Sequence, residues 1–489
     1  MRQAHTVKAA ALALRAAALG GLWLTMLAGA QAVAAGAAAQ QASDALAHDI
    51  LKQLVEINTT DSVGSVSTAA EAMAQRLRAA GFTAADLAVL GPEERKKNLV
   101  VRLRGSGAHK PVLLLGHLDV VEARREDWST DPFAFIEKDG YFYGRGTLDM
   151  KGPDAIMVAS LMRLKREGFR PARDVILALT ADEEGGCCNG VQWLLDNHRE
   201  LIDAELVLNQ DDYSVQLVNG RPLFFSVDAI EKAYADYQLE VTSPGGHSSE
   251  PSADNAILTL TRGLNRLGDY PFPFELNSVT REYYRRMADI ESGPLAADMR
   301  AVLEVPPDPR AVARLSADPV QYWETHTTCV PTRLEAGHAN NALPQRAQAV
   351  VNCRILPGHS RREMQQLLRS VLADAAIAVR YIASDGRVLA QAPEQPPFPP
   401  QPLLPELMKP LERVVGEVWP NLKVIPYLTP GASDSAHTAA VGWPSYTFAG
   451  LAVDPSDDRE HGRDERLGVE SFYRGNEFFY RFLKAFADR

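Results

Sequence analysis

Histidine and acidic side chains follow three apolar segments of this chain, at the places where side chains that do chemistry are expected. The segments are "VLLLG", "VILALT" and "LVLNQ", and the side chains that follow them are His117 and Asp119, then Asp182, Glu183 and Glu184, then Asp211 and Asp212. Carboxylates gathered at one place repel each other unless a cation neutralises them. A mixture of imidazole and carboxylate suits zinc, manganese or cobalt better than magnesium. The pattern therefore indicates a divalent metal site.

Two further segments carry single residues of the same chemical types. Asp149 lies in "YGRGTLDMKG", where glycines allow sharp backbone turns, and His461 lies in "DREHGRDER". His117 and Asp119 are two residues apart, so the Asp119 carboxylate can hold one imidazole nitrogen while the other nitrogen binds a metal ion. The His-x-Asp pair alone does not decide this, because a buried structural histidine can have the same local sequence.

The apolar segments alternate with helical ones in a way that predicts an α/β layer with a mostly parallel sheet. Strands are expected at "NLVVRLRG", "PVLLLGH", "DVILALT" and "AELVLNQ", and helices at 44–58, at 67–80 with Ser67 as N-cap, at 155–168 and at 190–201. The strands are continuously apolar, which fits a sheet covered on both faces. Ligands of open α/β sheets bind outside the carboxyl ends of the strands, so the acids and histidine should converge on one crevice.

The pattern changes near residue 228. Alternating strands are expected at "AYADYQLEVTS" and "QAVVNCRILPG", and helices at "NAILTLTRGLNRL" and "SRREMQQLLRSVLAD". This order predicts a compact α+β unit at residues 229–392, inserted into an α/β domain made of residues 43–228 and 393–489. Residues from about 272 to 330 are expected to embellish the inserted unit, and a proline-rich segment returns the chain to the α/β domain.

Size, composition and charge exclude several classes of protein. The chain has 489 residues, of which 46% are hydrophobic and 23% charged, as in an ordinary globular protein of two domains. Its formal net charge of −11 argues against a nucleic-acid-binding surface. No uninterrupted apolar stretch of about 18 residues occurs in the body of the chain, so no internal membrane span is expected.

The N-terminus has the three parts of a secretory signal peptide. Arg2, Lys8 and Arg15 supply positive charge, an apolar stretch follows, and small residues allow cleavage after Ala32 or Ala34. We expect residues 1–34 to be removed and the mature protein to be exported, into the periplasm if the source is Gram-negative or else secreted. No stable membrane span should then remain. A retained membrane anchor is the alternative.

The four cysteines are Cys187, Cys188, Cys329 and Cys353. Their spacing fits no zinc-finger pattern, so we expect structural roles. Export permits disulfides, but the sequence does not give their connectivity. A bond between the neighbours Cys187 and Cys188 is not expected, because it would be strained.

The motifs form an ordered series along the chain: "GHLDVV", "GRGTLDMKG", "DEEGG", "GGHSSEP" and "HGRDE". This series closely resembles the peptidase M20 family of zinc metallohydrolases, which includes carboxypeptidase-like, dipeptidase and N-acyl-amino-acid-hydrolysing enzymes. The resemblance covers nearly all of the chain after the N-terminal segment. It implies a zinc-peptidase-like α/β catalytic domain with a mostly parallel sheet and an inserted α+β lid or dimerisation domain.

The resemblance also implies a role for each matching residue. His117 would bind one metal ion, Asp149 would bridge two, and Glu184 and His461 would bind the second. Glu183 would be the general base that activates a water, with Asp119 orienting His117. The implied cofactor is two Zn²⁺ ions per chain bridged by Asp149, with Co²⁺ or Mn²⁺ as substitutes.

The ligand that follows the third strand is less clearly marked. Relatives in the family often place an acid near Asn209 or Gln210, where this chain has amides. We therefore expect Asp211 to be the ligand, with Asp212 as the fallback. The other interpretation of Asp212 is a solvated loop acid.

The resemblance extends to candidates outside the metal site. His247 in "SPGGHSSEP" resembles a family histidine that stabilises the developing oxyanion, often across a dimer interface, so a homodimer through the inserted domain is expected. Asn341 and Arg354 match substrate-binding positions, and Arg354 could clamp a carboxylate. A surface arginine is the other interpretation of Arg354. Gly431 lies in a loop, "PGASDSAH", that could contact substrate.

The function expected from these residues is metal-dependent hydrolysis. The substrate would be a small peptide or N-acyl amino acid with a free carboxylate, cleaved at the amide bond. A serine hydrolase is not supported, because no G-x-S-x-G elbow occurs, and no nucleotide-binding motif follows a strand. The remaining alternative is a catalytically weakened binding or assembly protein that keeps the fold. Glu183 argues against it, because metal binding alone does not require a second adjacent glutamate.

Overall fold

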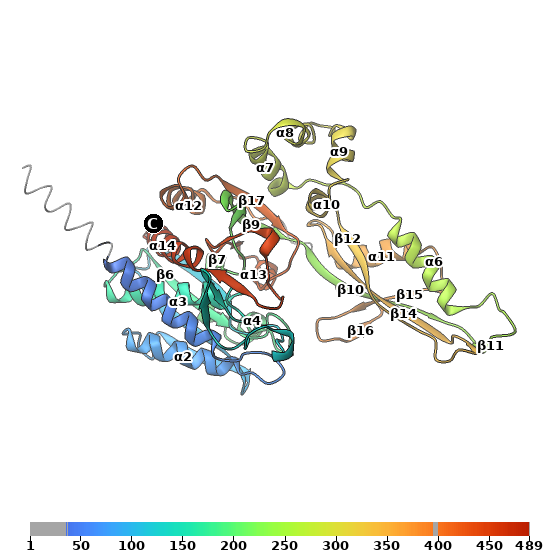
Figure 1. Cartoon of the computed structure of the whole chain (residues 1–489), viewed down its shortest axis with the longest axis horizontal. Coiled ribbons are helices and arrows are strands. Elements are labelled where there is room, and N and C mark those ends of the chain that lie inside the picture. Colours follow the sequence, from blue (N-terminus) through green and yellow to red (C-terminus); the bar gives the residue numbers. More distant parts are fainter. Residues whose placement is uncertain (1–35, 37, 395–399, 489) are drawn as a thin grey trace, which may run out of the picture.

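The computed structural model describes residues 36, 38–394 and 400–488. The expected signal segment lies outside the described residues, as does part of the proline-rich connection. Figure 1 shows two bodies, one at each side of the view, with the chain crossing from one to the other at β9 (Arg221–Glu231) and β10 (Ala233–Thr242). In the part of the chain that the structure describes, no helix has both the length and the apolarity that a membrane crossing requires.

A ten-stranded sheet forms the centre of the larger body. Besides β9, its strands are β1 (Leu87–Glu93), β2 (Lys96–Leu103), β3 (His109–His117), β6 (Arg173–Thr180), β7 (Leu206–Asn209), β8 (Val215–Val218), β17 (Val424–Thr429), β18 (Ser445–Thr447) and β19 (Ala452–Val453). Their order is β1-β2-β6-β3-β7-β18-β9-β8-β19, and β17 also pairs with β9. The central pairs β6–β3, β3–β7 and β7–β18 are parallel, whereas β1–β2, β2–β6 and β8–β9 are antiparallel. The expected α/β layer with a mostly parallel centre is confirmed.

Helices cover both faces of this sheet. On one face lie the helix at residues 38–55, α2 (Val66–Ala79), α3 (Lys151–Arg166), α12 (Pro405–Val418) and α14 (Val469–Ala487), and on the other lie α4 (Gly190–Asn197), α5 (Arg199–Ile202) and α13 (Ser435–Ala440). Within β3, Leu114 packs in the hydrophobic core under the first group of helices, and Leu113 and Leu115 pack in the core under the second group. A continuously apolar strand is expected for a sheet that is buried on both faces.

Helix α2 begins earlier than the sequence predicted. Ser65 is its N-cap, and the Ser65 hydroxyl accepts a hydrogen bond from the Thr68 N–H at 3.3 Å. The predicted cap at Ser67 is wrong. The Ser67 hydroxyl instead donates to the Glu94 carbonyl at 2.7 Å, which ties the helix to the turn between β1 and β2.

A five-stranded antiparallel sheet forms the second body. Its strands are β10, β12 (Thr328–Ala336), β14 (Arg346–Ile355), β15 (Ala378–Ile382) and β16 (Val388–Leu389), in the order β12-β14-β10-β15-β16, and α6 (Ala256–Gly268) and α11 (Arg361–Leu372) pack on it. A short hairpin of β11 (Gly246–His247) and β13 (Ala342–Leu343) forms the end of this body that is farthest from the larger one (Figure 1). The expected inserted α+β unit is confirmed as part of the fold.

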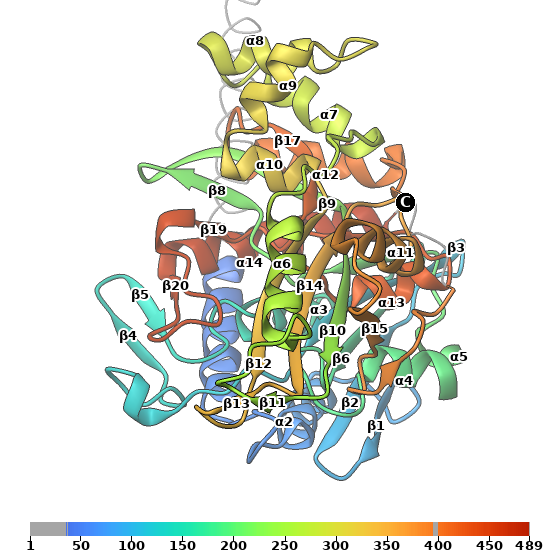
Figure 2. The same cartoon turned by 90° about the vertical axis from the view of Figure 1, so that its right-hand side faces the viewer.

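The segment expected to embellish the inserted unit packs elsewhere. It forms α7 (Ser278–Met287), α8 (Gly293–Ala301), α9 (Pro309–Leu315) and α10 (Pro319–Thr325). Apolar side chains of α7, α8 and α9 share a core with Phe224 of β9 and Ile425 of β17 in the ten-stranded sheet. Figure 2 shows α7, α8 and α9 stacked above β17. The sequence pattern gives the helices but not the sheet on which they pack.

Strand pairing ties the C-terminal part of the chain to the site region. A three-stranded sheet joins β4 (Ile136–Lys138), β5 (Tyr141–Tyr143) and β20 (Arg466–Gly468) in the order β20-β5-β4. The segment after β5, which holds Asp149, therefore runs beside the segment before β20, which holds His461.

All four cysteines form disulfides. Cys329 bonds to Cys353 across the paired strands β12 and β14, and Cys187 bonds to Cys188. The expectation that the neighbours do not bond is wrong. It was based on the strain of a bond between adjacent residues. The pair directly follows Gly185 and Gly186, whose φ values of 148° and 116° are positive, so the chain leading into the pair is not extended.

Candidate active site and metal centre

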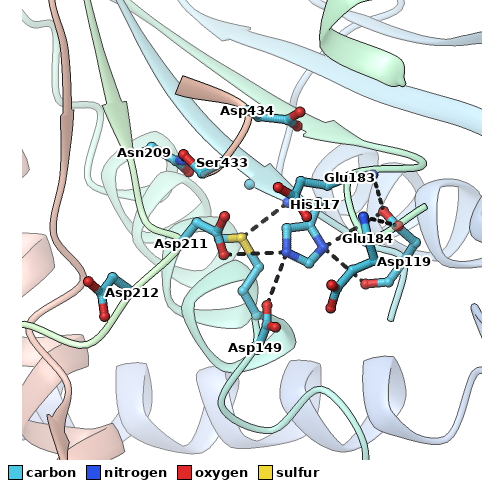
Figure 3. A network of polar contacts seen from close by, with 12 residues as sticks. His117, Asp119, Asp149, Glu183, Glu184, Asn209, Asp211, Asp212, Ser433 and Asp434 are labelled. Atoms are coloured by element: carbon cyan, nitrogen blue, oxygen red, sulfur yellow. Dashed lines mark hydrogen bonds and ion pairs between the residues drawn. The ribbon is translucent and has the colours of Figure 1, made fainter. Parts of the chain in front are cut away.

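The predicted convergence at the ends of the parallel strands is present. His117 ends β3, Glu183 and Glu184 follow β6, and Asp211 follows β7. Figure 3 shows their side chains turned toward one another, with Asp149 entering from below. Asp182, which follows the same strand as Glu183, turns away and pairs with Lys96.

Asp149 lies at the centre of this group. Its Oδ1 is 3.1 Å from His117 Nε2, and its Oδ2 is 2.8 Å from His461 Nε2. Glu184 lies 2.9 Å from His461 Nε2, and Asp211 lies 3.4 Å from His117 Nε2. One carboxylate with an imidazole at each oxygen, and a further carboxylate beside each imidazole, is a donor set suited to two divalent cations.

Three overlapping groups around Asp149 could each hold an ion. They are His117 with Asp149 and Glu184, His117 with Glu183 and Asp211, and Asp149 with Glu460 and His461, and within each group the ligand atoms lie within 4.8 Å of one another. Glu460 was not predicted from the sequence, although its position next to His461 was a signal. The cysteine pair with Glu93 forms another such group, but its sulfurs are committed to the disulfide.

The acid-base chemistry of the group shows why a cation fits. Burial, together with the Asp149 carboxylate, raises the pKa of Glu184 to about 7 and that of Glu460 to about 9. Burial and the Asp211 charge raise the pKa of Glu183 well above its usual range. Hydrogen bonds to Asp149 and Glu184 raise the pKa of His461 to about 10. Without a cation, the repulsion between these carboxyl groups is relieved by bound protons, and divalent ions would replace those protons.

Asp119 plays a different part from the one predicted. The His117 Nδ1 contacts the backbone carbonyl of Asp119 at 3.0 Å, and the Asp119 carboxylate is 3.7 Å away. That carboxylate accepts hydrogen bonds from the backbone N–H groups of Glu183 at 3.2 Å and Glu184 at 3.0 Å. In this structure the hydrogen bond to the imidazole is therefore made by the backbone carbonyl and not by the carboxylate. The residue's carbonyl orients His117, and its side chain fixes the turn that carries the two glutamates.

A buried ion pair fixes the segment that carries Asp149. The fully buried Glu465 accepts hydrogen bonds from the backbone N–H groups of Leu148 at 2.8 Å and Asp149 at 3.1 Å. Arg145 bonds to Glu465 at 2.8 Å and donates to the Gly462 carbonyl at 2.9 Å. Sequence reasoning did not single out this pair, although Glu465 closes the "HGRDE" motif.

Asp211, and not Asp212, faces His117. The Asp212 carboxyl points away from the group in Figure 3 and is hydrogen-bonded to Asp228. Asp212 lies in the loop between β7 and β8 and is partly exposed, and its carboxyl lines the cavity and pairs with Asp228. The two preceding amide side chains connect the end of β7 to neighbouring segments. Asn209 donates to Ser435 of α13 at 3.1 Å, and Gln210 donates to the Phe448 carbonyl after β18 at 2.5 Å.

A family model described as Peptidase family M20/M25/M40 matches residues 113–485. The chain belongs to peptidase family M20. The expected enzyme class, a hydrolase of amide bonds, is thereby confirmed. The matched range includes every residue described so far around Asp149.

Individual relatives and solved structures agree with the family. N-fatty-acyl-amino acid synthase/hydrolase PM20D1 of Mus musculus is 27% identical over 391 residues, which are 77% of this chain and 74% of that protein. A probable carboxypeptidase S-like 2 of Dictyostelium discoideum is 27% identical over 394 residues, covering 77% and 71%. The M20 family metallo-carboxypeptidase Sso-CP2 from Sulfolobus solfataricus superposes with a TM-score of 0.67 at 16% identity, over 90% of this chain and 99% of that one, which shows a common fold.

The predicted substrate-binding residues of this M20 chain fall at two separate places. Gly431 lines the cavity at the candidate metal centre, and Arg354 of β14 donates to the neighbouring Pro430 carbonyl at 3.5 Å. Asn341 and His247 lie at the far hairpin, where the Asn341 carbonyl accepts a hydrogen bond from the Ser248 N–H at 3.0 Å. The far hairpin is remote from the metal centre within one chain (Figure 1).

The cavity at the candidate metal centre of this M20 chain has a volume of about 370 Å³. Besides the candidate metal ligands, its lining includes residues of β8, β9, β17 and α10, and we call this part of the cavity the second compartment. Its acidic lining residues are Asp149, Glu183, Glu184, Asp211, Asp212, Asp228, Glu231, Asp458 and Glu460. No lysine or arginine occurs among the described lining residues, so no such side chain balances the acidic residues of the cavity.

Proposed function

We propose that this M20 chain is a metal-dependent amidohydrolase that cleaves a peptide or N-acyl amide bond in a small substrate with a free carboxylate. The observation that carries the proposal is the position of Asp149 between two imidazoles, with Glu183 within reach of the same group. The N-acyl amino acid and carboxypeptidase relatives support both substrate classes.

We propose a ligand set of His117, Asp149, Glu184, Asp211 and His461, with Asp149 between two ions. Zn²⁺ suits this mixture of imidazole and carboxylate, and Co²⁺ or Mn²⁺ would be accepted. When bound, such ions lower the pKa of a water and polarise the scissile carbonyl. Glu460 contacts the same group and is a further candidate ligand.

Glu183 is the residue that moves protons in this proposal. As a carboxylate, it takes a proton from the attacking water, and it then delivers that proton to the leaving amine nitrogen as the C–N bond breaks. The Asp119 carboxylate holds the Glu183 and Glu184 backbone N–H groups, so the two adjacent side chains stay divided between the water and the ion.

Substrate binding is assigned to the inserted domain and the loop at Gly431. Arg354 would clamp the substrate carboxylate beside that loop, with Asn341 as a further contact. We also propose that His247 donates to the oxyanion. Its Nδ1 is 2.7 Å from Ser249 Oγ, so Nε2 is the nitrogen left to donate. Because the far hairpin is remote from Asp149 in the same chain, a partner subunit or a large closure would have to bring His247 there.

We further propose a domain division at residues 43–228, 229–392 and 393–489, with export directed by residues 1–34. The charged, apolar and small-residue order of the N-terminus supports export, and two disulfides are consistent with an oxidising compartment.

The experiment is hydrolysis of a panel of dipeptides and N-acyl amino acids by the zinc-loaded protein, with Glu183→Gln alongside. We expect turnover of at least one class by the wild type and a loss of about 10³-fold or more in kcat in the variant, because the proton acceptor is gone while the side-chain shape is kept. Glu200→Gln, which changes an exposed glutamate on α5, is the matched control and should keep full activity. Equal activity of Glu183→Gln and wild type would contradict the proposed mechanism.

A further inference from the structure

The second compartment of the cavity has its own chemistry. Besides the candidate metal ligands, the cavity lining includes the acids Asp212 and Asp228 and the aromatic residues Tyr213, Trp323 and Tyr427. None of these residues belongs to the proposed metal ligands. The proposed mechanism therefore leaves this compartment without a role.

Asp228 is the least satisfied polar group in this compartment. Its side chain lines the cavity although the residue is only 3% exposed. Its Oδ1 has no hydrogen-bond partner in the described part of the chain. Its carboxyl is hydrogen-bonded to Asp212, and burial raises the pKa of Asp228 to about 7. A buried carboxyl group without a full set of partners is costly, so a donor from a ligand would stabilise it.

The aromatic residues favour one kind of ligand. Trp323 of α10 and Tyr427 of β17 make an edge-to-face pair with ring centroids 6.1 Å apart, and both rings border the cavity. Aromatic faces beside carboxylates attract organic cations, because the ring quadrupole adds to the charge attraction. A metal ion would gain less from such walls. Among the described residues, the groups that could hold an ion include neither Asp212 nor Asp228.

We propose that the compartment around Asp228, Asp212, Trp323 and Tyr427 binds a cationic group of the substrate, an ammonium or guanidinium carried several bonds from the scissile amide. This inference rests on the proposed function, because it assigns the substrate class of the same cavity. The enzyme would then prefer substrates with a basic side chain or a distal amine over their neutral equivalents. Strand β9 supplies Asp228 and strand β17 supplies Tyr427, so part of this pocket is built into the sheet.

The test is binding, measured by calorimetry on the zinc-loaded Glu183→Gln protein so that no turnover is needed. Two matched pairs serve as probes. Nα-acetyllysine against N-acetylnorleucine places the cation on the amino-acid side, and 6-aminohexanoyl-alanine against hexanoyl-alanine places it on the acyl side. We expect about tenfold or tighter binding of the cationic member in one pair, as for a charge-assisted contact. Adding Asp228→Asn should abolish this preference and leave binding of the neutral member within about twofold.

Two further variants show whether the preference arises in this compartment. Glu200→Gln in the same background should keep the preference, and Trp323→Leu should weaken it several-fold, which also tests the proposal if Asp228→Asn does not fold. Equal binding of both members in both pairs would overturn the proposal. So would an Asp228→Asn variant that binds fewer zinc ions per chain, because the carboxylate would then be a metal ligand.

Turnover of the same four compounds by the wild-type protein separates the two proposals. A clear binding preference without any hydrolysis would contradict the proposed hydrolase function and keep the cation pocket. Hydrolysis without any preference for the cationic members would keep the proposed hydrolase function and contradict the cation pocket.

Discussion

At the scale of single residues, Asp119 illustrates how spacing predicts proximity but not contact. Two residues after His117, it lies beside the imidazole as expected, yet its carbonyl makes that contact and its carboxylate binds the backbone of Glu183 and Glu184. A carboxylate that accepts two backbone N–H groups fixes the direction of the turn that follows β6. Its effect on catalysis is therefore exerted through the position of Glu183.

Asp119→Asn is expected to lower kcat by about 10- to 100-fold, the range found when outer-shell partners of metal sites are changed. The asparagine side chain can accept from only one of the two N–H groups and presents its own N–H₂ to the other. Because His117 is oriented by a carbonyl, the number of zinc ions bound per chain should stay the same. Steady-state kinetics and metal analysis of the same sample check this. Loss of zinc from a fully folded variant would show that the carboxylate orients His117 after all.

Several residues of the site could be predicted from the sequence because their partners are local or because strand ends meet at one edge. Glu465 could not, because its contacts lie more than 300 residues away, at Leu148 and Asp149. Asp228 could not be predicted either, because nothing in the local sequence of β9 shows that its side chain borders the cavity. Long-range partners leave no periodicity in a single sequence.

At the scale of elements, short apolar strands and amphipathic helices were predictable because burial imposes a repeat of two or 3.6 residues. Residues from about 272 to 330 were expected to embellish the inserted unit, but the packing of α7, α8 and α9 on β9 and β17 depends on which apolar faces meet. The step from β9 to β10 was also not predictable in detail. A single residue, Lys232, separates the strand of the first sheet from the strand of the second, and it is 1% exposed.

The pH dependence of stability should report on Lys232. Burial and the nearby Arg354 lower the pKa of Lys232 from 10.5 to about 7, so the unfolded chain binds more protons than the folded chain between these values. Stability should therefore rise with pH across that window, by up to about 1.4 kcal/mol per unit from this group. Glu324, whose pKa burial raises from 4.5 to about 8, acts in the opposite sense below pH 8, so the rise should be clearest above that value.

Lys232→Met removes this contribution. The unfolding free energy of the wild type relative to the variant should increase from about pH 8 to about pH 10, measured by urea unfolding at each pH. Lys409→Met, at an exposed position on α12, should show a constant difference from wild type. Parallel curves for wild type and Lys232→Met would mean that the buried amine keeps an ordinary pKa.

At the scale of the whole molecule, the two bodies place the candidate residues in two groups. Asp149 and its neighbours lie in the larger body, and the far hairpin with His247 lies at the opposite end of the inserted one (Figure 1). If His247 acts at the metal centre of a partner subunit, a homodimer is the active unit, and each centre needs residues from two chains.

Mixing two inactive variants tests this arrangement. Glu183→Gln and His247→Ala should each have little activity alone. After equal mixing with subunit exchange, half of the dimers carry one intact centre each, so activity should recover to about one quarter of the wild-type value. Recovery requires that the chains exchange, which native mass spectrometry of the mixture checks. Exchanged dimers without recovered activity would show that His247 acts within its own chain or not at all.

The proposed hydrolysis depends on two divalent cations at Asp149. This dependence is measured by the hydrolysis rate of chelator-treated protein during stepwise addition of Zn²⁺, with bound metal counted on the same samples. We predict no turnover in the metal-free protein and recovery as the count approaches two ions per chain. Asp149→Asn should not recover, because it loses the carboxylate that lies between the imidazoles of His117 and His461. Undiminished turnover by protein shown to hold no metal would contradict the proposed function.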